Sequence, residues 1–226
     1  MDSVAAELMD LLHTANNHED VVKCYSGIAE TFDKIQEALA YVGAKNGVKK
    51  CLEIGEVPKT ARILDIGAGT GIVGEMLQSM GYENLDALDG CQELLEKSRE
   101  RNCYRNLFCS FVVPDAELPV EKKAYDLVVM PGVVYPAHIL PTAFGQVIKV
   151  VKKGGLISWD MMVGQPEAYQ KDIGVMFREE NFEKYVNSYV DEGLWELVGK
   201  YDITFVERPS ASLNENAVCY IMRVLK

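Results

Sequence analysis

The sequence lacks the patterns that mark metal sites, secretion and membrane spans. Its 226 residues contain six cysteines and three histidines, but no Cys-x-x-Cys pair, so zinc-ligand spacing is absent. No apolar run approaches the roughly 18 residues of a membrane-spanning helix, and no basic segment followed by an apolar one opens the chain. We therefore expect a cytoplasmic protein with reduced cysteines, no metal and no membrane partner.

Positive charge is also scarce. The chain has 23 Lys and Arg against 34 Asp and Glu, a formal net charge of −11. Its sequence pI is about 4.8. Because phosphates are held mainly by clustered Lys and Arg, this balance disfavours nucleic acid as a partner. The content of hydrophobic residues, 48%, is that of a globular protein, and the length suits one domain over residues 1–226.

Residues 1–57 predict an N-terminal helical appendage. Apolar residues at helical spacing predict a helix over 2–14. Three- and four-residue steps from Tyr25 to Leu39 predict one amphipathic helix, and a third helix is expected over 48–54.

Residues 58–160 alternate short apolar runs with helical segments, as expected of a cofactor-binding core. Such alternation predicts a mostly parallel sheet with helices on both faces. The Lys-Lys-Gly-Gly sequence at 152–155 is expected to end a helix. The expected strands are 62–66, 85–88, 107–113, 125–130 and 156–159, and the expected helices are 71–80, 92–101 and 142–151.

Residues 161–226 do not continue this alternation of strands and helices. A helix is expected over 167–186, and strands over 201–206 and 217–225. The short connection of about ten residues between these strands suits an antiparallel hairpin. The expected fold is therefore α/β and Rossmann-like, with seven strands, mostly parallel, and an antiparallel C-terminal hairpin. The segment 160–195, together with the N-terminal helices, is the expected lid over a bound substrate.

The strongest chemical signal is the sequence Ile63-Leu-Asp-Ile-Gly-Ala-Gly-Thr-Gly71. An apolar strand runs into three alternate glycines, and a helix follows at once. Glycines permit the sharp turn and let a ligand lie against the main chain. Asp89 ends the next strand, where its carboxylate can accept both hydroxyl hydrogens of a ribose. Together these features predict an adenosine-containing cofactor.

The glycine spacing bears on which cofactor this is. A dinucleotide fingerprint that starts at Gly67 would need its third glycine at position 72, which is Ile72. A helix N-terminus that holds pyrophosphate is thus a poorer fit than a loop packed on a non-phosphate ligand. A nucleotide-dependent oxidoreductase stays as a rival.

The segment Asp65–Gly71 followed by Leu88-Asp89-Gly90 resembles the first two motifs of class I S-adenosylmethionine-dependent methyltransferases. The resemblance continues in order through 114–119, 125–129 and 152–157. More narrowly, the segment Leu88–Lys97 and the later Gly-Gly-Leu-Ile are similar to the methyltransferase-like family named for the Williams–Beuren region.

The resemblance implies S-adenosylmethionine as the cofactor. The glycine loop would hold its methionine end and Asp89 its ribose, while Asp115 would meet the adenine amino group and Ala116 would offer its backbone amide. Tyr25 looks like a tyrosine that some members place over the cofactor. From the residues alone, Asp115 is equally a turn residue and Tyr25 equally a core residue. The full predicted set is Tyr25, Asp65, Gly67, Ala68, Gly69, Gly71, Asp89, Gly90, Asp115, Ala116 and Met130.

Three residues are candidates for catalysis. His138 and Tyr135 follow the fourth strand, where class I enzymes place acceptor-facing residues, and a histidine can take a proton near neutral pH. An ordinary surface loop is the other interpretation of both. Asp160, after the fifth strand, either orients an acceptor or caps a turn.

The fourth strand leads into Met130-Pro-Gly-Val133 and not into the Asn/Asp-Pro-Pro-aromatic segment of enzymes that methylate exocyclic base nitrogens. No Pro-Cys pair, the mark of cytosine C5 enzymes, occurs. With the acidic pI, this favours methyl transfer to an O, N or S atom of a small molecule. A protein methyltransferase and a non-catalytic S-adenosylmethionine-binding protein are the alternatives.

Overall fold

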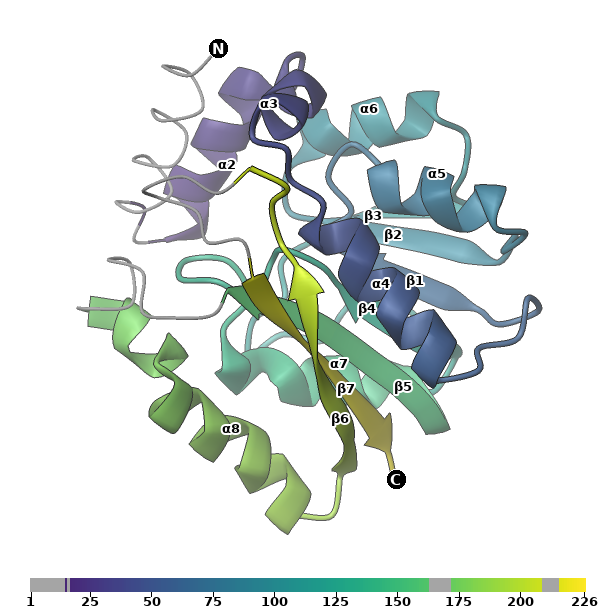
Figure 1. Cartoon of the computed structure of the whole chain (residues 1–226), viewed down its shortest axis with the longest axis vertical. Coiled ribbons are helices and arrows are strands. Elements are labelled where there is room, and N and C mark those ends of the chain that lie inside the picture. Colours follow the sequence, from purple (N-terminus) through teal and green to yellow (C-terminus); the bar gives the residue numbers. More distant parts are fainter. Residues whose placement is uncertain (1–14, 16, 163–171, 209–215) are drawn as a thin grey trace.

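The protein is described by a computed structural model that covers residues 15, 17–162, 172–208 and 216–226. Seven strands and the helices around them make up these residues (Figure 1). The strands are β1 (Ile63–Ile66), β2 (Leu85–Asp89), β3 (Asn106–Cys109), β4 (Tyr125–Met130), β5 (Val151–Met162), β6 (Trp195–Thr204) and β7 (Asn216–Val224). The helices are α2 (His18–Ile28), α3 (Phe32–Ala38), α4 (Gly43–Ile54), α5 (Ile72–Ser79), α6 (Gln92–Glu100), α7 (Phe144–Val150), α8 (Glu179–Asp191) and the 3₁₀ turns η1 (Pro141–Ala143) and η3 (Asp172–Phe177).

The strands form one sheet in the order β3-β2-β1-β4-β5-β7-β6. Strands β1 to β5 pair in parallel, and β7 runs antiparallel between β5 and β6. The predicted seven-stranded, mostly parallel sheet with an antiparallel C-terminal hairpin is therefore confirmed. The strand order reverses between β1 and β4, which is where ligands bind in sheets of this kind.

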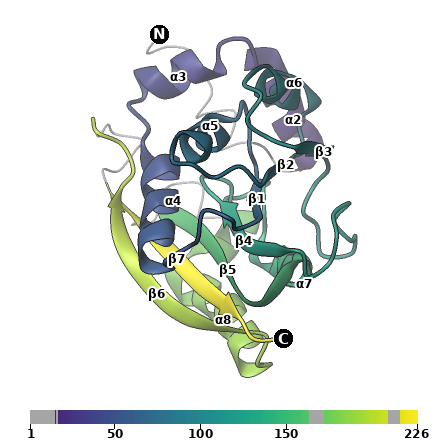
Figure 2. The same cartoon turned by 90° about the vertical axis from the view of Figure 1, so that its right-hand side faces the viewer.

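Helices cover both faces of the sheet (Figure 2). On one face, α4 and α5 pack their apolar residues on side chains such as Leu127 and Val129 of β4. On the other face, α7 and α8 pack on Val128 and Met130 of the same strand. A strand that is buried on both faces reads as a continuous apolar run and not as an alternation. This explains why the sequence identified β4 with its correct bounds.

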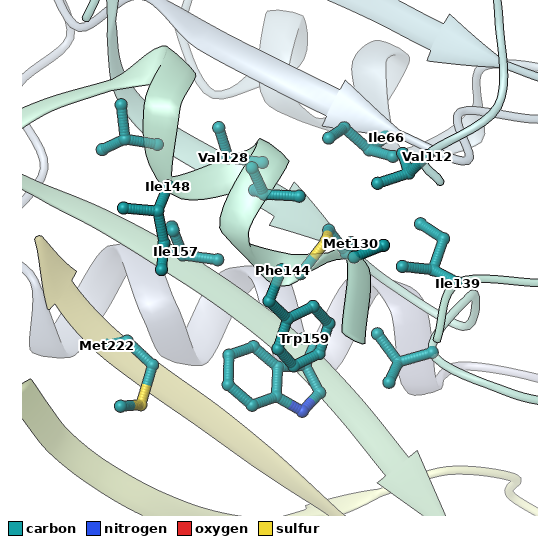
Figure 3. Close-up of a cluster of buried hydrophobic side chains, with 14 of the residues drawn as sticks. Ile66, Val112, Val128, Met130, Ile139, Phe144, Ile148, Ile157, Trp159 and Met222 are labelled. Carbon is teal, nitrogen blue, oxygen red and sulfur yellow. The ribbon is translucent and has the colours of Figure 1, made fainter. Parts of the chain in front are cut away.

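Aromatic side chains fill the layer between the sheet and the helices α7 and α8. Figure 3 shows Phe144 of α7 lying against Trp159 of β5, with the ring centroids 4.9 Å apart. Trp159 stacks in turn on Trp195 of β6 at 5.7 Å and on Tyr220 of β7 at 5.1 Å. The cluster joins the parallel half of the sheet to the antiparallel hairpin.

The N-terminal helices differ from the prediction. The single helix expected from Tyr25 to Leu39 is two helices, α2 and α3, with a turn at residues 29–31. In this turn both the backbone N–H and the hydroxyl of Thr31 donate to the Ile28 carbonyl, which replaces the helical bond there. The helix α4 begins at Gly43, earlier than expected. The predicted helix over 2–14 lies outside the described residues.

Two strands also differ from the prediction. Strand β3 ends at Cys109, although an apolar run continues to Val113, because β3 pairs only with β2, and β2 ends at Asp89. Strand β5 begins at Val151 and includes the Lys-Lys-Gly-Gly segment, which forms an irregularity in the pairing with β4 and has Gly154 at φ +82°. The glycines here bend a strand and do not separate it from the helix.

The expected helix over 167–186 is confirmed at residues 179–186 and wrong at residues 172–178. Residues 172–177 form the 3₁₀ turn η3, and α8 begins at Glu179, after Arg178 in an extended conformation. The hairpin strands begin earlier than expected, at Trp195 for β6, because an irregularity in the pairing between Leu197 and Gly199 interrupts the alternation that marks a strand.

We expect the substitution Phe144→Ala to lower the free energy of unfolding by about 3–5 kcal/mol, because it empties a site that is fully buried among aromatic rings. Urea unfolding followed by circular dichroism measures this loss. Leu197→Ala, at a side chain that is 47% exposed, is the control and should change stability by less than about 0.5 kcal/mol. Equal losses in both variants would contradict the packing described.

Candidate functional site

A cavity of about 260 Å³ lies at the carboxyl ends of β1, β2 and β4, where the strand order reverses. The loops that follow these strands form one side, and the helices α2 and α3 lie across it (Figure 1). Its lining includes Tyr25, Phe32, Gly69, Asp89 and Val133. The cavity therefore brings together segments that lie far apart in the sequence.

The glycine loop after β1 opens its main chain to this cavity. Gly67 has φ +74°, and a Cβ there would come within 2.1 Å of the Val133 side chain, so only glycine fits. Its N–H donates to the Leu88 carbonyl at 2.7 Å, which ties the turn to β2. At Gly69 the nearest atom to an added Cβ is a ring carbon of Phe32, 3.7 Å away. A ligand can thus approach the backbone of Gly69.

Asp89 is held in place at the end of β2 by backbone N–H groups. One carboxylate oxygen accepts from Gly69 and the other from Cys91, both at 2.8 Å. Burial raises the pKa of Asp89, and the hydrogen bonds from Cys91 and Gly69 lower it in part. An ionised carboxylate offers about four acceptor positions, so two remain for the hydroxyls of a ribose. The structure therefore fits the role that the sequence predicted.

An aromatic pair forms the wall beyond Asp89. The Phe111 ring lies over Gly90, where an added Cβ would come within 2.3 Å of it, and it stacks on the His18 ring at 4.4 Å. The His18 Nε2 donates to the backbone carbonyl of His138 at 3.1 Å. This pair could not be predicted from the sequence, because it joins α2 to the loop after β3.

The residues predicted to meet adenine lie elsewhere. Asp115 and Ala116 are exposed in the loop between β3 and β4, and neither lines the cavity. The preceding segment, Ser110 to Val112, lines it instead. The contact of Asp115 and Ala116 with adenine stays a prediction.

Met130 and Gly71 do not line the cavity either. The Met130 side chain is buried in the apolar cluster near Ile139 (Figure 3), and the residues after it, from Pro131 to Val133, reach the cavity. Gly71, at φ +87°, caps the N-terminus of α5. Of the predicted set, Tyr25, Gly67, Ala68, Gly69, Asp89 and Gly90 do line the cavity.

Asp65 is buried behind the glycine loop and does not line the cavity. One carboxylate oxygen accepts the Tyr104 hydroxyl at 2.5 Å, and the other has no partner among the described residues. Burial raises the pKa of Asp65 to about 7, against a lowering by the Tyr104 hydrogen bond. The Tyr104 ring packs on Gly74, where a Cβ would come within 2.2 Å of it. Asp65 thus positions the Tyr104 ring against the first turn of α5.

Tyr25 and His138 are joined across the cavity. The His138 Nδ1 lies 2.9 Å from the Pro136 carbonyl, which only accepts, so Nδ1 carries the hydrogen and Nε2 accepts from the Tyr25 hydroxyl at 3.0 Å. Burial lowers the pKa of His138 and raises that of Tyr25. Both rings are thus neutral near pH 7. Tyr135 meets the His138 ring edge-on at 5.9 Å and also lines the cavity.

Asp160 lies next to Gly132, one of the residues that line the cavity. It is 3% exposed, and its Oδ1 accepts from the N–H of Gly132, a lining residue, at 3.1 Å. Burial raises the pKa of Asp160 to about 7, while the hydrogen bond from Gly132 lowers it. The carboxyl therefore changes its charge readily near neutral pH.

A polar cluster fastens α3 to the glycine loop. The Arg101 guanidinium donates to the Thr70 carbonyl at 2.7 Å and pairs with the carboxylates of Asp33 and Glu75. The Thr70 hydroxyl also donates to Asp33 at 2.5 Å. The sequence did not reveal this cluster, because its members come from α3, α5 and the end of α6.

Among residues 15, 17–162, 172–208 and 216–226, no group of three or more His, Cys, Asp or Glu side chains could hold a metal ion. Within the same ranges, every helix is too short or too polar to cross a membrane.

Comparison with known proteins adds an independent line of evidence. Residues 63–155 match the model of the methyltransferase domain family. The curated Methyltransferase-like protein 27 of Homo sapiens is 30% identical over 101 residues, which are 44% of this chain and 40% of that protein. Malonyl-[acyl-carrier protein] O-methyltransferase of Serratia marcescens is 23% identical over 175 residues, 77% of this chain and 64% of that protein. The chain thus matches less than two thirds of the length of these relatives.

Solved structures of methyltransferases share the fold of this chain. An S-adenosylmethionine-dependent methyltransferase from Clostridium acetobutylicum superposes with a TM-score of 0.61 at 18% identity, over 90% of this chain and 100% of that one. Residues 63–155 thus match the methyltransferase domain family, and the fold of the chain is that of S-adenosylmethionine-dependent methyltransferases. The predicted fold is confirmed, and the match over residues 63–155 supports the predicted superfamily, whereas the narrower resemblance to the Williams–Beuren-region family has only weak support.

We expect Asp65→Asn to remove part of the pH dependence of stability. Since the pKa of Asp65 is raised from 3.8 to about 7 on folding, its contribution to stability is lost as pH rises through that window. The variant should therefore gain roughly 2 kcal/mol relative to the natural chain between pH 5.5 and pH 8. Urea unfolding at both pH values measures the difference.

Asp160 has a similar pKa but is present in both proteins, so its effect cancels. Asp202→Asn, at an exposed position on β6, removes the same charge from the surface and is the control. A difference between Asp65→Asn and the natural chain that stays constant with pH would show that Asp65 is ionised at all these pH values.

Proposed function

We propose that the protein binds S-adenosylmethionine in the cavity and transfers its methyl group to an O, N or S atom of a small molecule. One observation carries the proposal. The Asp89 carboxylate is fixed by the N–H groups of Gly69 and Cys91 and keeps two acceptor positions for a ribose, next to a loop whose main chain is open to a ligand. The match to the methyltransferase domain family and the methyltransferase fold support S-adenosylmethionine as the cofactor.

The residues present suit each part of this cofactor. Asp89 would hold the ribose hydroxyls, the backbone of Gly67 to Gly69 the methionine end, and the apolar wall at Phe111 and Val112 the adenine. The cofactor supplies a methyl group on a sulfonium that carries its own leaving group. The chain therefore has chiefly to hold the acceptor in line and exclude water, and orientation alone can contribute on the order of 7–11 kcal/mol.

Tyr25 and His138 are the residues that we propose for proton movement. The neutral His138 Nε2 already accepts the Tyr25 hydroxyl, so a proton released by an acceptor at Tyr25 could pass on to His138. Tyr135 would help to orient the imidazole from its other side. Base catalysis of this kind contributes about 10²–10⁴-fold where the acceptor must lose a proton.

The shape of the site supports a small-molecule acceptor. The cavity is roofed by α2 and α3 and lined largely by apolar residues, among them Leu39, Tyr41 and Phe205. Such a space suits a small, partly apolar molecule better than a protein chain. The net charge of −11 disfavours nucleic acid.

A direct experiment tests the proposal and separates its alternatives. The full chain is incubated with methyl-labelled S-adenosylmethionine and a cell extract, and the label is followed into the small-molecule, protein and nucleic-acid fractions. Label in small molecules supports the proposal. Label in protein would make the chain a protein methyltransferase, and tight cofactor binding without any transfer would make it a non-catalytic binding protein.

We expect Asp89→Ala to weaken binding of S-adenosylhomocysteine by about 10- to 150-fold, the loss of a charged acceptor worth about 1.5–3 kcal/mol. Isothermal calorimetry on the folded variant measures this, with Asp202→Asn as the control that removes a surface carboxylate. An unchanged affinity would exclude Asp89 from the site. No heat from the natural chain with either the methyl donor or its demethylated product would contradict the function itself.

A second binding prediction distinguishes the two segments that could meet adenine. Since the Phe111 ring lies over Gly90 and Asp115 is exposed away from the cavity, we expect Phe111→Ala to weaken binding of S-adenosylhomocysteine by about tenfold or more. Asp115→Ala should change it by less than about twofold. The reverse order of effects would restore Asp115 as the adenine contact.

A further inference from the structure

Two buried oxygens next to Gly132, a residue that lines the cavity, lack a hydrogen-bond partner. They are the Asp160 Oδ2 and the Tyr41 hydroxyl oxygen, and neither has a partner among the described residues. Both lie around Gly132, because its N–H donates to the Asp160 Oδ1 and a Cβ on it would come within 2.5 Å of the Tyr41 hydroxyl. Tyr41 and Gly132 line the cavity and Asp160 lies directly behind Gly132, so a ligand that contacts Gly132 comes close to both oxygens.

Buried carboxylates are normally paired with a cation or fully hydrogen-bonded, because desolvation of an isolated charge costs several kcal/mol. None of the ion pairs found in the described part of the chain includes Asp160. The hydrogen bond from the Gly132 N–H is the main interaction that offsets the cost of burying the Asp160 carboxyl. Asp160 therefore lacks a cationic partner in this part of the chain, and a positive charge supplied by a ligand would favour its ionised form.

The neighbouring side chains restrict what can supply that charge. Tyr41 and Phe205 meet edge-on with ring centroids 4.9 Å apart, and both line the cavity next to Ala44. Aromatic rings tolerate an organic cation and an apolar chain, but they provide no ligands for a metal ion. A group with several N–H donors would satisfy both orphaned oxygens at once, whereas a hydroxyl or thiol has a single hydrogen.

We propose that Asp160 and Tyr41 form a binding subsite for an amino group of the methyl acceptor, so that the substrates are amines with a small apolar remainder. This inference rests on the proposed function, because it assigns the end of the same cavity that the nucleoside leaves free. Asp160 binds the ammonium or amine, Tyr41 accepts a second N–H, and the Tyr41 and Phe205 rings cover the carbon atoms next to the nitrogen.

The cofactor has an amino group of its own, on its methionine end, and this is the other source of the same chemistry. Two cofactor fragments distinguish the sources. S-adenosylhomocysteine keeps the amino acid, and 5′-methylthioadenosine has the same nucleoside without it. If Asp160 binds the acceptor, Asp160→Asn changes the affinity for both fragments by less than about twofold. A loss of tenfold or more for S-adenosylhomocysteine alone would assign Asp160 to the cofactor and overturn the proposal.

The acceptor is tested with matched probes on the full chain saturated with S-adenosylhomocysteine. The probes are 2-phenylethylamine against 2-phenylethanol and n-butylamine against n-butanol, and their dissociation constants are measured by titration of protein NMR signals. We expect each amine to bind at least about tenfold tighter than its alcohol, the size of one charge-assisted hydrogen bond. Equal binding of amine and alcohol, or no binding of either, would overturn the proposal.

Three variants complete the experiment. Asp160→Asn keeps an oxygen for the Gly132 N–H and should reduce the preference for amines to below about twofold. Tyr41→Phe keeps the ring and removes only the hydroxyl, so it should reduce the preference in part and serves if the first variant fails to fold. Asp202→Asn is the matched surface control and should keep the full preference. A full preference in both Asp160→Asn and Tyr41→Phe would also overturn the proposal.

The outcome is independent of the test of the main function. If the natural chain does not bind S-adenosylhomocysteine, the proposed function fails. If it binds this compound but does not prefer amines, only the amine subsite fails.

Discussion

The site depends on one interaction, the pair of hydrogen bonds that hold the Asp89 carboxylate between two backbone N–H groups. One comes from Gly69 in the glycine loop and the other from Cys91 at the start of α6, so the ends of β1 and β2 are fixed to each other. The Gly67 N–H, which donates to Leu88, strengthens the same junction. A carboxylate that is ordered before the ligand arrives loses little entropy on binding, which is the advantage of preorganisation.

The roof of the cavity is attached to this junction by weaker contacts. Arg101 links α3 to the glycine loop through Asp33, and Tyr25 links α2 to His138. The Asp33 carboxylate is 45% exposed, and partly exposed ion pairs contribute about 1 kcal/mol or less. The sheet below is held by continuous ladders and a closed aromatic cluster. Opening of the roof therefore costs less free energy than disruption of the sheet, as ligand entry requires.

Much of the fold could be predicted because its central strands are buried on both faces and read as uninterrupted apolar runs. The same reasoning failed at the end of β3, because the length of this edge strand is set by its pairing with β2 alone. It also failed at the turn before Phe32, because the hydrogen bond from the Thr31 hydroxyl to the Ile28 carbonyl interrupts the helix there. Asp89 was predictable because it ends a strand beside the glycine loop. Phe111 and His18 were not, since their contact depends on how α2 and the loop after β3 meet in space.

Three carboxyls at the carboxyl ends of β1, β2 and β5 show how function opposes stability here. Asp89 has two N–H partners, Asp65 has one hydroxyl, and Asp160 has one N–H, so the compensation is incomplete at the last two. Burial without full compensation raises the pKa values of both to about 7, which lowers stability at neutral pH. A ligand with a sulfonium or an ammonium group would bring a positive charge close to these carboxyls. The burial of carboxyls around the cavity, which lowers stability, is thus the same property that would favour such a ligand over a neutral one.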